Sequence, residues 1–152
     1  MAYEFKAQRR VEFSETDLAG IVHYSNFFRY METAEHGFFR ALGFSIAPRQ
    51  FAEGETKIGW PRVHASCDYR KPLRFEDIVE IHLLVVERKT KAITYQIRFN
   101  RVSGDTREEV ARGRLTVVCV AWDEATSAMK ATTIPAAIAS QIEAAPAELL
   151  AD

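Results

Sequence analysis

The residues most able to do chemistry stand together in the stretch FSETDLAGIVHYSNFF, residues 13–28. Asp17 offers a carboxylate, Gly20 follows it, and Tyr24 lies where a helical pattern begins. The first N–H groups of a helix are unpaired and carry the positive end of its dipole. A carboxylate just before such a terminus suits a reaction in which a carbonyl oxygen becomes an oxyanion. The ordinary alternative for a loop aspartate is a turn or a cap.

A long helix is predicted to follow this loop, capped by Ser25 or Asn26. Apolar side chains recur at three- and four-residue steps as far as Gly43, which suits a left-handed C-terminal position. Further aromatic residues widen the apolar stripe, so we expect a helix largely enclosed by other structure. The stripe consists of Phe27, Met31, Ala34, Phe38 and Leu42, with Phe28, Tyr30 and Phe39 beside it.

Strands are predicted on both sides of the helix. Residues 5–13 have the composition of a strand, and period-two alternation marks 62–70, 78–88, 92–101 and 108–123. Residues 89–91 and 102–105 supply short turns. The Ala-rich chain from Pro135 predicts one short helix and a frayed tail. Because one helix cannot cover both faces of a five-stranded sheet, we expect an α+β domain over 1–135, a C-terminal helix and tail over 136–152, and a homodimer.

The composition excludes several classes of protein. The chain has 152 residues, 47% of them hydrophobic and 27% charged, which is typical of one globular domain. A net charge of -1 argues against nucleic acid or a membrane surface as the main partner. The segment MAYEFKAQRR lacks an apolar core of signal-peptide length, and no run of about 18 apolar residues occurs, so a soluble, cytoplasmic protein is expected. Cys67 and Cys119 have no metal-ligand spacing and are expected to be small buried residues.

The element order and the motif after the first strand resemble the hotdog-fold acyl-CoA thioesterases, in the branch of 4-hydroxybenzoyl-CoA thioesterase and the Tol-Pal-associated thioesterases. The motif residues are Thr16, Asp17, Gly20, Ile21, Val22, His23, Tyr24, Asn26 and Phe27. A second block, VHASCDYRKPLRFED (63–77), resembles the family's second strand and the turn beyond it. The resemblance covers residues 5–122. It implies a hotdog fold, in which a five-stranded antiparallel sheet wraps around one long central helix.

The resemblance also implies an activity and a site. The activity is hydrolysis of an aromatic or a short to medium acyl-CoA to free acid and CoA, without metal or organic cofactor. Asp17 would act as nucleophile or general base, and the Tyr24 backbone N–H would bind the thioester oxygen. Gly20 would allow close approach of the ligand. This chain departs from several relatives at His23 and Tyr24, because those relatives have an aromatic residue followed by a histidine at these positions. The implied substrate-binding residues are Gly20, His23, Arg88, Lys89 and Lys91, the last three for the CoA phosphates near a subunit boundary. His64 is a further candidate for the acyl pocket, because it is on the polar side of its predicted strand and follows a proline-bounded loop.

Several alternatives remain open at this point. A second hotdog branch places its catalytic acid on the central helix, where this chain has Glu35, while Glu32 is expected to pair with His36. A hotdog enoyl-CoA hydratase would use Asp17 with His23, and a third class is a non-catalytic acyl-CoA-binding domain. The turn 87–92 is alternatively a solvated edge, and His64 a buried structural histidine. For assembly we expect at least a homodimer, with a homotetramer as the favoured state.

Overall fold

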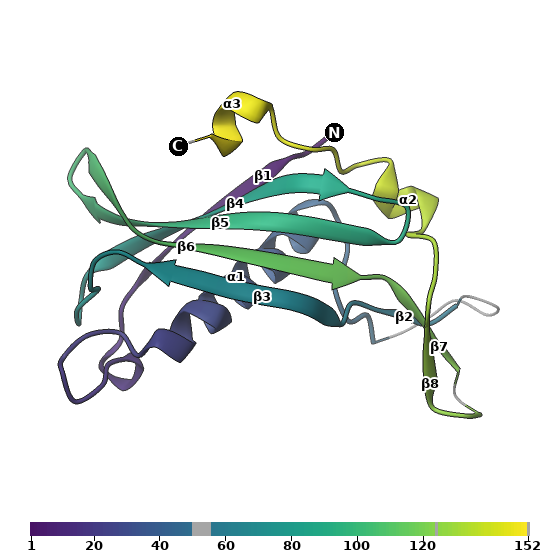
Figure 1. Cartoon of the computed structure of the whole chain (residues 1–152), viewed down its shortest axis with the longest axis horizontal. Coiled ribbons are helices and arrows are strands. Elements are labelled where there is room, and N and C mark those ends of the chain that lie inside the picture. The colour runs from purple at the N-terminus through teal and green to yellow at the C-terminus, as the bar shows by residue number, and fades with distance from the viewer. Residues whose placement is uncertain (50–55, 124, 152) are drawn as a thin grey trace.

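The computed structural model describes residues 1–49, 56–123 and 125–151. Its main sheet is built from β1 (Glu4–Arg10), β3 (Arg62–Tyr69), β4 (Ile78–Arg88), β5 (Ala92–Ser103) and β6 (Thr106–Val118). The strands are ordered β1-β4-β5-β6-β3, and every neighbouring pair is antiparallel (Figure 1). The predicted five-stranded antiparallel sheet is therefore confirmed.

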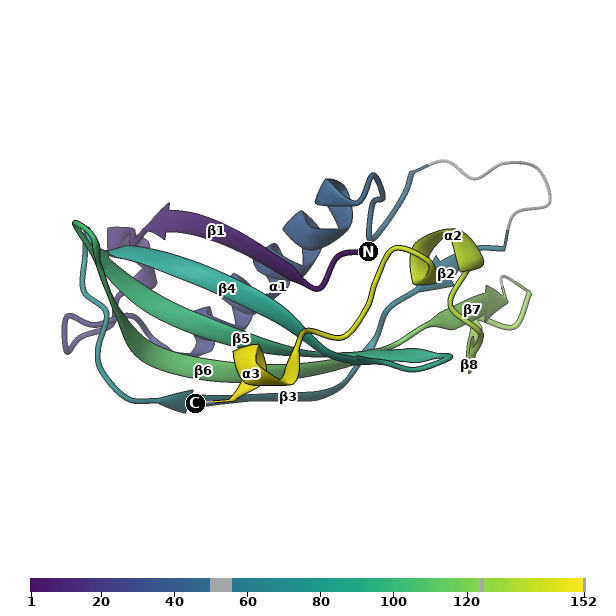
Figure 2. The ribbon, with the colours of Figure 1, turned by 90° about the horizontal axis from the view of Figure 1, so that it is seen from above.

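One long helix, α1 (Tyr24–Ala41), lies across one face of this sheet (Figure 2). Its apolar stripe supplies the centre of the core, where Phe27, Tyr30 and Phe38 are almost completely buried. Gly37 allows a close approach to β1, because a Cβ there would lie 2.6 Å from the ring of Phe5. Gly43 ends the helix with φ +90°, the left-handed conformation expected from the sequence. The hotdog arrangement of helix and sheet is confirmed.

The predicted last strand, 108–123, is wrong as a single element. β6 ends at Val118, and the chain continues as β7 (Val120–Asp123) in a smaller sheet with β2 (Ile58–Gly59) and β8 (Ala128–Ala131). At the break, the Cys119 N–H donates to the Lys91 carbonyl at 2.7 Å. Residues 117–122 are all apolar, and Cys119 and Val120 are both buried, although the strand changes partners between them.

The C-terminal segment differs from the predicted single helix and frayed tail. It forms two one-turn helices, α2 (Ala136–Ala139) and α3 (Ala147–Leu150), joined by a packed segment. Ile142 is completely buried, and the Ala145 N–H donates to the Val85 carbonyl at 2.8 Å. α3 lies on the face of the sheet opposite α1, where Arg98 donates to the Leu149 carbonyl at 2.7 Å (Figure 2). The division of the chain at residue 135 stays a prediction.

Neither cysteine of the chain is in a disulfide, and Cys119 is fully buried as expected, whereas Cys67 is half-buried. Within the described ranges, none of the helices is both long enough and apolar enough to cross a bilayer.

Candidate active site

The loop between β1 and α1 carries Asp17 and is tied to its surroundings by backbone contacts. A one-turn 3-10 helix, Phe13–Glu15, opens the loop. The Glu15 carbonyl accepts both the His23 N–H, at 2.9 Å, and the Asn26 side-chain amide, at 2.8 Å. The Val22 N–H donates to the Leu73 carbonyl at 2.8 Å. These contacts fix the position of Asp17 relative to the start of α1.

Asp17 forms a tight turn of its own. Its Oδ1 accepts the Ala19 N–H at 2.9 Å, and its backbone N–H donates to the Ile21 carbonyl at 2.8 Å. Gly20 closes the turn with φ +79°, a conformation that side-chain-bearing residues seldom adopt. Among the described residues no donor contacts Oδ2. The carboxylate is thus oriented through one oxygen, while the other stays available.

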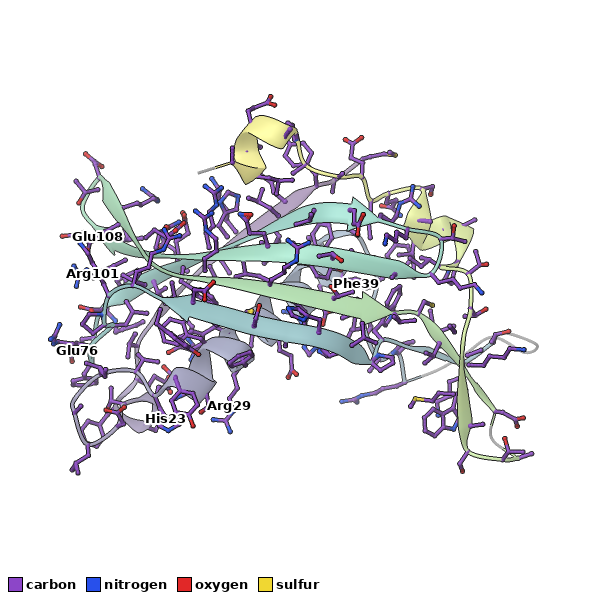
Figure 3. All side chains as sticks on the ribbon, in the orientation of Figure 1. His23, Arg29, Phe39, Glu76, Arg101 and Glu108 are labelled. Atoms are coloured by element: carbon purple, nitrogen blue, oxygen red, sulfur yellow. The ribbon has the colours of Figure 1, made fainter. Side chains whose placement is uncertain are left out.

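The N-terminus of α1 is capped by His23, so the expected cap at Ser25 or Asn26 is wrong. His23 Nδ1 accepts the Ser25 N–H at 3.2 Å, and its ring stacks on Tyr24 with 4.4 Å between centroids. Figure 3 shows His23 at the start of the helix. The Tyr24 N–H, the first of the helix, has no hydrogen-bond acceptor within the part of the chain that the structure describes. It is therefore free to bind an oxyanion.

Asp17 and Tyr24 line one cavity of about 500 Å³. Its wall is largely apolar and includes Phe27 and Tyr69, whose rings meet edge to face at 5.2 Å. The Tyr69 hydroxyl donates to the Tyr24 carbonyl at 3.1 Å, which ties the end of β3 to the first turn of α1. Sequence reasoning missed Tyr69, because only the fold brings it to the helix terminus. The remaining lining residues are Ile21, Val22, Arg70, Lys71, Pro72, Leu73 and Arg74.

The rim of this cavity is basic. Arg70 and Lys71 are paired with Glu109 and Glu108 respectively, the second pair at 2.5 Å. The Arg74 side chain has no acidic partner among the described residues. Figure 3 shows Glu76, Arg101 and Glu108 on the side of the molecule where His23 lies. Residues 70–74 thus line the same cavity as Asp17.

The other predicted binding residues lie elsewhere in one copy of the chain. His64 is exposed on the outer edge strand β3, with its Nε2 3.2 Å from the Ser66 hydroxyl, so the buried structural alternative does not hold. The β4–β5 turn is at the opposite end of the sheet from Asp17. There Arg88 donates to the Ile142 carbonyl at 2.8 Å and Lys89 lies 3.5 Å from Glu87. A role for Arg88, Lys89 and Lys91 stays a prediction.

The α1 carboxylates Glu32 and Glu35 do not line the cavity that holds Asp17. Glu35 is completely buried and bonded to Arg62, and its Oε2 has no partner among the described atoms. Burial outweighs the attraction of Arg62 and raises the pKa of Glu35 to about 7. Glu32 lies 3.9 Å from Arg62, and His36 lies 3.9 Å from Glu35, so the expected Glu32–His36 pair does not form.

Comparison with known proteins identifies the family. A sequence profile of the Thioesterase-like superfamily matches residues 11–142. A putative esterase from Aquifex aeolicus is 40% identical over 91 residues, which are 60% of this chain and 68% of that protein. A 1,4-dihydroxy-2-naphthoyl-CoA hydrolase from Synechococcus elongatus is 31% identical over 80 residues, 53% of this chain and 57% of that protein.

Solved structures agree with the sequence matches. The 4-hydroxybenzoyl-CoA thioesterase of Pseudomonas sp. strain CBS-3 superposes with a TM-score of 0.78 at 25% identity, covering 91% of this chain and 99% of that one. A 4-hydroxybenzoyl-CoA thioesterase with an aspartate-to-asparagine mutation, complexed with 4-hydroxybenzoyl-CoA, gives 0.79 at 25% identity over 91% and 98% of the chains. The chain described here belongs to the Thioesterase-like superfamily and is a hotdog-fold thioester hydrolase.

Proposed function

We propose that the chain hydrolyses an acyl-CoA to the free acid and CoA, with Asp17 as nucleophile or general base and the N-terminus of α1 as the oxyanion site. The observation that carries this proposal is that Asp17 and Tyr24, whose N–H has no acceptor among the described residues, line the same cavity. A thioester carbonyl between them would meet the carboxylate on one side and a dipole-backed donor on the other. Donors preorganised at a developing oxyanion are commonly the largest contribution to such catalysis.

Asp17 could promote thioester hydrolysis by either of two routes. In the first, an Asp17 oxygen attacks the thioester carbon, the C–S bond breaks to release the CoA thiolate, and water hydrolyses the mixed anhydride. In the second, Asp17 takes a proton from water as the water oxygen attacks, and the thiolate leaves and is protonated. In both, the turn bond from the Ala19 N–H would hold Oδ1 while Oδ2 faces the substrate. Trapping of an acyl-enzyme by rapid quench and mass spectrometry supports the first route, and its absence the second.

An aromatic acyl group is the favoured substrate. The relatives named above act on 4-hydroxybenzoyl-CoA and 1,4-dihydroxy-2-naphthoyl-CoA, both of which carry aromatic acyl groups. The cavity wall offers the edge-to-face pair of Phe27 and Tyr69 to such a ring. A panel of these two substrates, benzoyl-CoA and hexanoyl-CoA, followed by release of free thiol, tests this choice. A hydratase or a binding domain would release no thiol.

Asp17→Asn tests the central assignment. Asparagine keeps an oxygen for the Ala19 N–H but carries no charge, so kcat should fall by roughly a hundredfold or more. Binding of a non-hydrolysable acyl-CoA analogue should persist, and stability should change by about 1 kcal/mol or less. Asp105→Asn, at an exposed turn outside the cavity, is the matched control. A stable Asp17→Asn protein with near-normal kcat would refute the assignment, and a selective loss in Glu35→Gln would move the chemistry onto the helix.

A further inference from the structure

A second region of open space lies away from the Asp17 cavity, at the C-terminal end of α1. It consists of a cavity of about 590 Å³ beside α2 and a neighbouring one of about 300 Å³ beside His36 and Arg62. The two share four wall residues, Ile46, Pro48, Ile58 and Trp60, so they lie next to one another. Neither shares a residue with the cavity that holds Asp17, and all residues named for these walls belong to the described ranges.

The two parts of this space differ in character. The larger cavity is mainly apolar, with Phe44, Trp60 and Ile138 in its wall. Trp60 is only 6% exposed and meets Phe39 edge to face at 5.3 Å, so its ring is a fixed wall. Its wall also includes the polar residues Ser45, Thr56, Thr132 and Thr133. Both volumes are within the range of about 300–1,000 Å³ found for small-molecule sites.

The smaller cavity carries the basic groups. Lys57 lines it and has no acidic partner among the described residues. Arg62 also lines it and is held rigidly, since one guanidinium nitrogen donates to the Trp60 carbonyl at 2.9 Å and another is bonded to Glu35. A guanidinium has five N–H donors, so these two contacts leave others for a ligand. Burial lowers the pKa of His36, so this imidazole offers hydrogen bonding at neutral pH rather than charge.

We propose that these two adjoining cavities together form a second binding site, for an amphipathic monocarboxylate. The carboxylate would lie at Lys57 and Arg62, and the alkyl or aryl part would pack on Trp60 and Phe44 in the larger cavity. A lysine and a guanidinium at one end select an anion, and the apolar walls select the rest of the molecule. This proposal does not depend on the chemistry assigned to Asp17, and it is tested by ligand binding alone.

The test uses decanoate as the probe and the full-length chain. Trp122→Phe, on the exposed β7–β8 hairpin, leaves Trp60 as the single tryptophan, so its emission reports binding at the proposed wall. We expect saturable binding of decanoate that persists in an Asp17→Asn background. Decanol, which lacks the charge, should bind at least about tenfold more weakly. Equal affinities for decanoate and decanol would overturn the carboxylate assignment.

Two substitutions with matched controls locate the site. Ala137→Trp places a large ring at the cavity wall and should abolish decanoate binding, whereas Ala136→Trp, one position earlier on α2 and outside the lining, should not. Lys57→Gln should weaken binding about tenfold or more, and Lys130→Gln, on exposed β8, should leave it unchanged. Thr133→Trp replaces Ala137→Trp if melting shows that the latter is unfolded. Unchanged binding in either the cavity-filling variant or Lys57→Gln would refute the proposal.

Discussion

Because the Glu35 carboxylate is buried, we predict that the free energy of unfolding depends on pH. Its pKa is raised from 4.5 to about 7, chiefly by burial, so the folded protein favours the neutral form. Between these two values the folded chain holds a proton that the unfolded chain has released. The contribution of Glu35 to stability is therefore fully present below pH 4.5 and is lost as the pH rises through 7. The whole shift corresponds to about 3 kcal/mol, most of which is lost between pH 5 and 8.

Glu35→Gln removes this titration and should change the pH profile of unfolding. Urea denaturation at pH 5 and pH 8, at one fixed protein concentration, gives the unfolding free energy of each protein. The wild-type protein should lose roughly 2 to 3 kcal/mol more than Glu35→Gln between the two pH values. Glu32→Gln is the matched control, because that carboxylate is one turn earlier and more than half exposed, at 57%, so its profile should follow wild type.

Two results would contradict this reasoning. A difference between wild type and Glu35→Gln that does not vary with pH would mean that Glu35 does not titrate in this range. A wild-type protein that gains stability relative to Glu35→Gln as the pH rises would mean that Arg62 outweighs burial and lowers the pKa below 4.5. Either outcome would mean that Glu35 is ionised between pH 5 and 8 and forms a charged pair with Arg62.

Three further predictions concern catalysis and assembly. Tyr69→Phe removes the hydrogen bond to the Tyr24 carbonyl, so kcat should fall severalfold with KM nearly constant; an unchanged kcat would remove Tyr69 from the positioning of the oxyanion site. β3 has one unpaired edge and an exposed Val63, so light scattering should give at least a dimer, and a fully active monomer near 17.3 kDa would refute this. Reversing the charges of Arg88 and Lys89 should raise KM for acyl-CoA more than it lowers kcat, and less so for a substrate truncated to the pantetheine arm; equal effects on both substrates would mean that the turn is structural.

Local pattern was sufficient for the elements whose partners are adjacent in the chain. The stripe from Phe27 to Phe38 predicted α1, and the short loop at 89–91 predicted the β4–β5 pair. The break at Cys119 was not predictable, because the apolar run VVCVAW (117–122) continues across it without a turn signal. Residues 120–123 leave the main sheet only because β2 and β8 provide other partners. Likewise, Ile142 is buried by contacts made with segments more than fifty residues away, such as Arg88.

Some residues of the candidate site could also be predicted from sequence, whereas others could be found only from the fold. Asp17 beside a helix terminus could be proposed from local pattern, while the roles of Gly20 and Tyr24 came from the family resemblance, and all three remain predictions. Tyr69 could not be proposed in this way, because its hydroxyl meets Tyr24 only after β3 has been placed beside β6.

The structure also changes how the two interpretations of Asp17 relate to one another. The sequence presented a turn former and a catalytic group as alternatives, but the Ala19 N–H occupies only Oδ1. The turn therefore orients the carboxylate toward the cavity that Tyr24 shares, and a catalytic role would depend on it. Because asparagine preserves the turn and removes only the charge, Asp17→Asn separates two functions that one side chain can perform together.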